Sequence, residues 1–207
     1  MNNLIDRLSR RLKLPLPGPE AHRLMMPEGS EKSRFDEARM AKARLSSVLI
    51  LLYEKDGEVC IPLTQRHVYD GTHSGQISFP GGKWEQGDID LIHTAKREAR
   101  EEIGVTESDV KIIGQLSDLF IPPSNFRVSP FVSYVDKRPK FVLDAYEVKE
   151  LIEVPVSHLL KASTVKETVI EFSSGFKLQT PYFDVDGRIV WGATAMMLSE
   201  LKSILTS

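Results

Sequence analysis

The sequence predicts an α+β fold in which helices cover both faces of a mixed β-sheet, an αβα sandwich. Three observations support this fold class. Apolar, strand-like runs fill residues 46–66, a single amphipathic helix follows at residues 89–104, and a second apolar helix lies at residues 193–205. A chain of 207 residues is also long enough to bury a sizeable core.

Two dipeptides mark tight turns between predicted strands. Asp56-Gly57 separates the two apolar runs near the start, and Asp186-Gly187 follows a strand-like segment late in the chain. A type I′ turn needs positive φ at both central positions, which aspartate and glycine tolerate. We therefore expect a β-hairpin at the first dipeptide and another turn at the second.

The helix predicted over residues 89–104 has defined ends and one apolar face. Asp88 or Asp90 can cap its first turn, and Gly104 is placed to end it. Apolar side chains recur at helical spacing and are expected to face the core: Ile92, Ala95, Ala99 and Ile103.

The remaining elements follow from shorter patterns. Further strands are predicted at residues 76–79, 110–120, 129–135, 168–174, 177–186 and 188–193. Residues 144–162 are expected to form a turn, then a helix or an extended entry, and then a helix. The last helix is expected to bury Met196, Leu198, Leu201 and Ile204.

The composition is that of a soluble globular protein, with 41% hydrophobic and 27% charged residues. The net charge of -2 gives no indication of nucleic acid or an anionic membrane as a partner. No stretch reaches the roughly 18–20 apolar residues that a membrane span requires. Cys60 is the one cysteine and lies in an apolar run, so we expect a buried strand residue in a reducing, cytoplasmic compartment.

The N-terminal 1–45 segment is expected to form a helix and an irregular arm, ahead of the domain at 46–207. Leu4, Leu8 and Leu12 recur at helical spacing, so a short helix is predicted there. That helix is expected to dock on the domain or on a second subunit, which would give a homodimer.

Three glutamates crowd into little more than one turn of the predicted helix. Glu98, Glu101 and Glu102 project to one side, and like charges at this spacing cost roughly 0.2–0.5 kcal/mol per pair. One interpretation is a solvated acidic face, which the possible pairing of Arg97 with Glu101 supports.

A second interpretation is a site for a divalent metal. The carboxylates border the buried face of the helix, and the helix follows the glycine-rich segment at residues 79–88, whose backbone can approach it closely. Carboxylates and a backbone carbonyl make a hard oxygen site of the kind that Mg²⁺ or Mn²⁺ prefers. Such a site suits a diphosphate substrate.

This segment resembles the signature of the Nudix hydrolases. That signature is Gly, five residues, Glu, seven residues, Arg-Glu, an apolar residue, any residue, Glu-Glu, any residue, Gly and an apolar residue. Here Gly82, "KWEQG" and Asp88 are followed by an eight-residue spacer and "REAREEIGV" at 97–105. The aspartate and the longer spacer both look like the coenzyme A pyrophosphatase branch.

Upstream residues point to the same branch. Its entry motif is similar to "LTQRHVYDGTHSGQISFPGG", in which Arg66 and the Phe-Pro-Gly-Gly segment match. His67 stands where Ser or Ala is usual, and Gly71 stands where Arg or Lys is usual. The resemblance covers roughly residues 46–200.

The resemblance implies a Nudix-type αβα sandwich and metal-dependent cleavage of coenzyme A or a derivative to 3′-phospho-AMP and 4′-phosphopantetheine. It implies that Glu98 and Glu102 are the principal Mg²⁺ or Mn²⁺ ligands, with Glu101 a third. Gly81 would add its carbonyl, and Arg97 would orient the glutamates by bidentate pairing.

Some assignments stay open at this stage. The general base is Glu98 or a glutamate of a later loop, Glu147 or Glu150. The candidate substrate-binding residues are Arg66, Gly82, Lys83 and Phe126. The alternative functions are the same chemistry on ADP-ribose, a dinucleotide or a nucleoside triphosphate, and a non-catalytic ligand sensor.

Overall fold

A computed structural model describes residues 1–68, 74–172 and 175–207. The helices are α1 (Asn2–Arg11), α2 (Gly18–Arg23), α3 (Glu31–Arg34), α4 (Glu37–Ala41), α5 (Leu91–Ile103), α6 (Val156–Leu160) and α7 (Gly192–Thr206), with 3-10 turns at Glu107–Asp109 and Ala162–Thr164. Gly71, a departure from the expected motif, and the end of the strand predicted at residues 168–174 lie outside the described residues.

The strands form two sheets. They are β1 (Arg44–Lys55), β2 (Glu58–Arg66), β3 (Ile77–Ser78), β4 (Gly81–Lys83), β5 (Lys111–Gln115), β6 (Leu119–Ile121), β7 (Phe126–Tyr134), β8 (Val148–Pro155), β9 (Val165–Glu171), β10 (Lys177–Val185) and β11 (Arg188–Trp191). Across the described residues, the main sheet runs β3-β2-β1-β7-β5, with β4 also paired to β1, β6 to β7 and β8 to β2. The β1–β7 pair is parallel and its neighbours are antiparallel, so this sheet is mixed.

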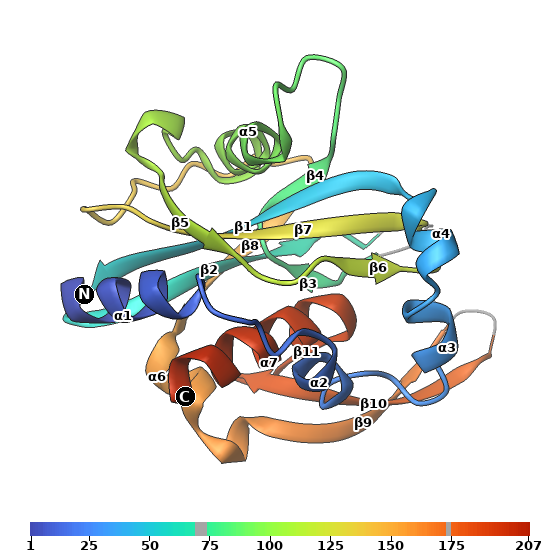
Figure 1. Ribbon diagram of the computed structural model, residues 1–207. Helices are drawn as coiled ribbons and strands as arrows, with labels where there is room; N and C mark the ends of the chain where they lie inside the picture. Colours follow the sequence, from blue (N-terminus) through green and yellow to red (C-terminus); the bar gives the residue numbers. More distant parts are fainter. Residues whose placement is uncertain (69–73, 173–174) are drawn as a thin grey trace.

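The layers follow from the two faces of β1. Its residues Leu49, Leu51 and Tyr53 are fully buried on the face that packs against α5. The alternate residues Ile50 and Leu52 are fully buried on the other face, in the core that includes α7. Figure 1 shows α5 above the main sheet, α7 below it, and the β9–β10 ribbon on the far side of α7. The predicted αβα arrangement around a mixed sheet is confirmed.

The local predictions also hold where the described residues test them. Asp56 and Gly57 have φ of 51° and 82°, and Asp186 has φ of 50°, as tight turns with positive φ require. Asp90, not Asp88, caps α5, because its side chain accepts the His93 N–H at 2.7 Å.

The ends and the core face of the main helices are as expected. Gly104 ends α5 in the left-handed conformation, at φ 72°. The predicted core residues of α7 are all buried: Met196, Leu198, Leu201 and Ile204. Of the two alternatives for residues 148–155, the extended one is observed, since β8 pairs along β2 from Cys60–Pro155 to Arg66–Val148.

The N-terminal residues pack against the rest of the chain. Ile5 and Leu8 of α1 and Met25 belong to the same core cluster as α7. The stretch at residues 12–35, expected to be irregular, contains the short helices α2 and α3. Residues 37–46 were expected to be a short helix or an arm, and the helix α4 is observed there. Tertiary contacts and local caps hold them, for example the Asp36 side chain that accepts the Arg39 N–H at the start of α4. Among the described residues, no helix is long and apolar enough to cross a bilayer.

A buried glutamate holds this N-terminal segment in place. Glu200 of α7 is fully buried and accepts hydrogen bonds from His22 Nε2 at 2.9 Å, Ser117 Oγ at 2.7 Å and the Gly18 N–H at 3.2 Å. Burial raises the pKa of Glu200, but the bonds from His22 and Ser117 lower it, and the net shift is downward. A lowered carboxyl pKa means that this stabilisation is present above the ordinary glutamate pKa and is lost as pH falls through the lowered value.

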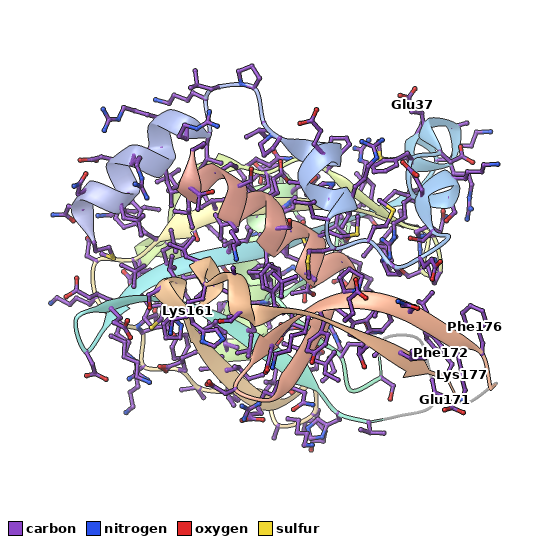
Figure 2. The ribbon with its side chains drawn as sticks, turned by 90° about the horizontal axis from the view of Figure 1, so that it is seen from below. Glu37, Lys161, Glu171, Phe172, Phe176 and Lys177 are labelled. Atoms are coloured by element: carbon purple, nitrogen blue, oxygen red, sulfur yellow. The ribbon has the colours of Figure 1, made fainter. Side chains whose placement is uncertain are left out.

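We predict that Glu200→Ala lowers the free energy of unfolding by about 2–4 kcal/mol, because it leaves buried donors without an acceptor. Urea denaturation followed by circular dichroism measures this. The control is Glu171→Ala at the surface near the tip of the β9–β10 hairpin (Figure 2), whose effect should stay within about 0.5 kcal/mol. Equal effects of the two substitutions would contradict the role given to Glu200.

Candidate active site

Glu102 is the most buried of the three predicted metal ligands. Its side chain lies on α5 and is 3% exposed. One carboxylate oxygen accepts the Gly81 N–H at 3.3 Å, and the other accepts Arg66 Nη2 at 3.3 Å. Burial raises the pKa of Glu102 to about 8, with the charges of Glu98 and Glu147 also acting upward against the lowering effect of Arg66.

Glu98 lies directly against the glycine loop. A Cβ atom placed on Gly82 would lie 2.5 Å from the Glu98 carboxyl carbon, so only glycine leaves room for that carboxylate. Gly81 is equally constrained, since it has φ of 155° and its Cβ would lie 2.3 Å from the Ser47 carbonyl oxygen. Burial raises the pKa of Glu98 as well, and the charge of Glu147 adds to this effect. The two glycines therefore bring β4 and α5 close enough to gather carboxylates between them.

Arg97 joins the loop to the helix. It binds both oxygens of Asp88, with Nε at 2.8 Å and Nη2 at 3.0 Å, and its Nη2 also donates to the Lys83 carbonyl at 3.1 Å. Its Nη1 lies 2.9 Å from Glu98 Oε1 and 3.0 Å from Glu101 Oε2. The hydrogen bonds from Arg97 hold the pKa of Asp88 far below its usual range.

Glu101 lies apart from the other two glutamates. Its side chain is 48% exposed, and its carboxylate is shared between Arg97 and Arg100, each at 3.0 Å. The structure therefore brings Glu98 and Glu102 together at the glycine loop and places Glu101 at the rim of that site.

The two later glutamates have different surroundings. Glu150 on β8 pairs with Arg188 of β11 at 2.5 Å. The charge of Glu147, on the turn before β8, acts to raise the pKa of both Glu98 and Glu102.

Asp144 builds the turn that carries Glu147, and the sequence analysis did not identify it. Its side chain accepts the Tyr146 and Glu147 N–H groups at 2.8 and 3.0 Å, and its own N–H donates to the Glu102 carbonyl at 3.0 Å. The signal available in the sequence was an aspartate three residues before a glutamate, as in an Asx turn.

The predicted substrate-binding residues fall in two places. Arg66, at the end of β2, contacts Glu102 as described above. Lys83 and Phe126 instead line one hollow of about 360 Å³, whose other lining residues are Arg44, Leu45 and Trp84. Gly82 lies between these two places, because it contacts Glu98 and precedes Lys83 in β4.

The chemistry of the donor set fits a divalent metal ion. Glu98 and Glu102 supply hard carboxylate oxygens. The charge of Glu98 raises the pKa of Glu102 and the charge of Glu147 raises both, so a cation would relieve this repulsion. In the part of the chain that the structure describes, no three acidic, histidine or cysteine side chains form a complete ligand group, and Arg66 and Arg97 balance the carboxylate charge. Protein ligands would thus be few, which is usual for Mg²⁺, since it keeps several waters and binds substrate phosphates.

Comparison with known proteins agrees with this site. A model of the NUDIX domain matches residues 43–168. Nudix hydrolase 3 of Caenorhabditis elegans is 33% identical over 175 residues, which cover 77% of this chain and 72% of that protein. An uncharacterized Nudix hydrolase, NudL of Yersinia enterocolitica, is 34% identical over 149 residues, which cover 69% of this chain and 75% of that protein.

Solved structures share the fold. The Nudix hydrolase RenU of M. smegmatis aligns with a TM-score of 0.55 at 13% identity, over 79% of this chain and 86% of that chain. The mixed sheet flanked by helices is thus the sandwich of a Nudix-type hydrolase. The chain belongs to the NUDIX family, and it is an enzyme of the diphosphatase class. Nudix hydrolases generally use divalent metal ions.

The close contact at Gly82 gives a first test of the site. We predict that Gly82→Ala displaces the Glu98 carboxylate and lowers diphosphate hydrolysis by about 100-fold, since misplacement by about 1 Å can have that effect. The control is Gly87→Ala in the same loop, where an added Cβ has no neighbour within 4 Å and activity should stay near wild type. Steady-state kinetics of both folded variants measures this, and equal activities would contradict the assignment.

The raised pKa of Glu102 gives a second test. With a pKa of about 8, this carboxyl is mostly protonated at neutral pH and must lose its proton to bind a metal. We predict that binding of Mn²⁺ releases protons, and that the affinity rises as pH increases toward that pKa. Calorimetry in buffers of different ionisation enthalpy counts the protons. The Glu102→Gln variant should bind Mn²⁺ more weakly and release fewer protons. If the number of protons released is unchanged, the protons do not come from Glu102.

Proposed function

We propose that this Nudix hydrolase cleaves the diphosphate bond of coenzyme A or its derivatives, with Mg²⁺ or Mn²⁺, to 3′-phospho-AMP and 4′-phosphopantetheine. The observation that carries the proposal is the placement of Glu98 and Glu102 against the Gly81–Gly82 backbone, next to a cation, Arg66. The choice of coenzyme A rests on the sequence, where the long spacer, Asp88 and the segment around Arg66 resemble that branch.

Glu98 and Glu102 would hold the metal ion, together with the carbonyl oxygen of Gly81 and with Glu101 at the rim. When bound, the ion would neutralise phosphate charge and lower the pKa of a water. The Gly81 N–H and Arg66 position Glu102, while Arg97 positions Glu98 and ties it to the loop through Asp88. Arg66 is then also close enough to the carboxylates to contact a phosphate held there.

The reaction is the addition of water to one phosphorus atom of the diphosphate. The bond from that phosphorus to the bridging oxygen breaks, the bridging oxygen leaves with the other phosphate, and a base takes a proton from the water. We assign Glu98 as this base because it lies against the glycine loop, with Glu147 as the alternative because its charge acts on Glu98. Glu150 is less suited, since Arg188 holds its carboxylate.

Two further aspects of the proposal concern the whole protein. Buried Cys60, whose pKa burial raises, agrees with a structural thiol, and we propose a cytoplasmic location. A homodimer through the N-terminal arm stays a prediction. Leu8, one of the leucines that suggested it, is buried within its own chain. Light scattering of the full chain tests it.

The test of function is a substrate panel. Coenzyme A, ADP-ribose, a dinucleotide and a nucleoside triphosphate are incubated with Mg²⁺ or Mn²⁺, with and without EDTA. We expect coenzyme A to be cleaved fastest, and EDTA, Glu98→Gln and Glu102→Gln each to lower turnover by at least about 100-fold. Preferred cleavage of ADP-ribose would replace the substrate but keep the chemistry. Full activity of both variants would overturn the site assignment, and binding without turnover would indicate a ligand sensor.

A further inference from the structure

A second feature of the molecule lies beside the carboxylates, where three strands end together. Arg44 of β1 is opposite Phe126 of β7, and the Trp84 N–H donates to the Leu45 carbonyl at 3.0 Å. The hollow of about 360 Å³ opens at this place, and its volume lies within the usual range of small-molecule sites.

The aromatic and cationic groups of this hollow are held in place from outside it. The Arg44 guanidinium lies 4.2 Å from the centroid of the Phe126 ring, and its Nη2 donates to the Ser124 carbonyl at 2.7 Å. Arg44 is therefore positioned before any ligand arrives. Trp84 keeps 42% of its surface exposed, so part of the indole is available for contact with a ligand.

The hollow is connected to the carboxylates through β4. Gly82 contacts Glu98, and Trp84 follows two residues later in extended backbone, which corresponds to about 7 Å. The Lys83 carbonyl accepts a hydrogen bond from Arg97, so the floor of the hollow is fixed to the helix that carries the carboxylates. If a diphosphate binds at Glu98 and Glu102, one of its two substituents would lie in this hollow. The separation of about 7 Å along β4 is about the length of one ribose.

The lining residues select between those substituents. An exposed indole offers a flat face on which a nucleobase can stack. Any base can stack in this way, because stacking does not depend on the hydrogen-bonding groups of the base. Arg44 and Lys83 provide cations for an anionic group, and Lys83 forms an exposed pair with Glu85 at 3.2 Å. An aromatic base that carries its own phosphate satisfies both features, whereas an uncharged amide chain satisfies neither.

We infer that the hollow lined by Trp84, Arg44 and Lys83 binds the nucleoside half of the substrate, with the base on Trp84 and a ribose phosphate at the two cations. This inference rests on the proposed function, since it names the part of the diphosphate substrate that this side of the site takes. Trp84 and Arg44 would then be specificity-determining residues.

The molecule contains a second hollow with a tryptophan, which provides the competing location. It has about 410 Å³ and is lined by residues that include Gln65, Phe172, Arg188 and Trp191. Phe172 and Trp191 contact each other edge to face, with centroids 6.2 Å apart. Figure 2 shows Phe172 at the hairpin tip, well separated from Glu37 of α4, the helix that precedes Arg44.

The two tryptophans of the chain make a direct binding test possible. Trp191→Phe leaves Trp84 as the fluorescent reporter, and Trp84→Phe leaves Trp191. Each full-length variant is titrated with adenosine 3′,5′-bisphosphate, and circular dichroism confirms that it is folded. We expect saturable quenching in Trp191→Phe and no saturable change in Trp84→Phe. The inference would be overturned if saturable quenching occurred only in Trp84→Phe. It would also be overturned if neither variant showed quenching at bisphosphate concentrations that inhibit hydrolysis.

A kinetic arm tests the phosphate contact. Arg44→Ala and Lys83→Ala should each raise the KM for coenzyme A about tenfold more than the KM for dephospho-coenzyme A, with kcat little changed. The matched control is Lys42→Ala, an exposed lysine close to Arg44 in sequence that does not line the hollow, and it should leave both KM values unchanged. Equal rises for both substrates would overturn the assignment.

The two proposals fail in distinguishable ways. If Glu98→Gln abolishes hydrolysis of coenzyme A while the bisphosphate leaves Trp84 fluorescence unchanged, the diphosphatase assignment stands and the nucleoside site is wrong. If the bisphosphate quenches Trp84 but no diphosphate is hydrolysed, the binding site stands and the proposed function is wrong.

Discussion

The contact of Arg97 with Asp88 is the interaction on which the candidate site depends. It joins the end of the glycine loop to the middle of α5 by two short hydrogen bonds, and the same guanidinium reaches Glu98, Glu101 and the Lys83 carbonyl. A planar group with five donors can make all these contacts at once, which a lysine ammonium could not. The Glu98 carboxylate lies against Gly82 because this arginine fixes the glycine loop to the helix that carries Glu98.

Much of the fold was predictable because its signals are local. The Asp56-Gly57 turn, the Asp90 cap and the Gly104 end of α5 each depend on a few neighbouring residues, and all three are observed. The apolar run of β1 correctly indicated a strand, and the structure shows that this strand is buried on two faces. The sequence could also indicate which glutamates share a side of α5, because helical spacing alone determines this.

What could not be predicted depends on contacts between distant residues. Helical spacing indicated the Arg97–Glu101 pair, but the burial of Glu102 depends on Gly81 and Arg66, which lie on other strands. The partners of Glu200 come from residues 18, 22 and 117, far from it along the chain, so the helix α2 that they hold was expected to be irregular. The hollow at Trp84 likewise needs the ends of three strands to meet, and only Lys83 and Phe126 had been singled out from it.

The position of Glu200 has a consequence for synthesis on the ribosome. Gly18 and His22 leave the ribosome early, but the carboxylate that accepts their hydrogen bonds lies 182 and 178 residues further along the chain. The N-terminal helices therefore have to wait, with Ile5 and Leu8 uncovered, until almost the whole domain has emerged. Final docking of the first segment thus follows the synthesis of α7, and until then a nascent chain would expose that apolar surface to chaperones.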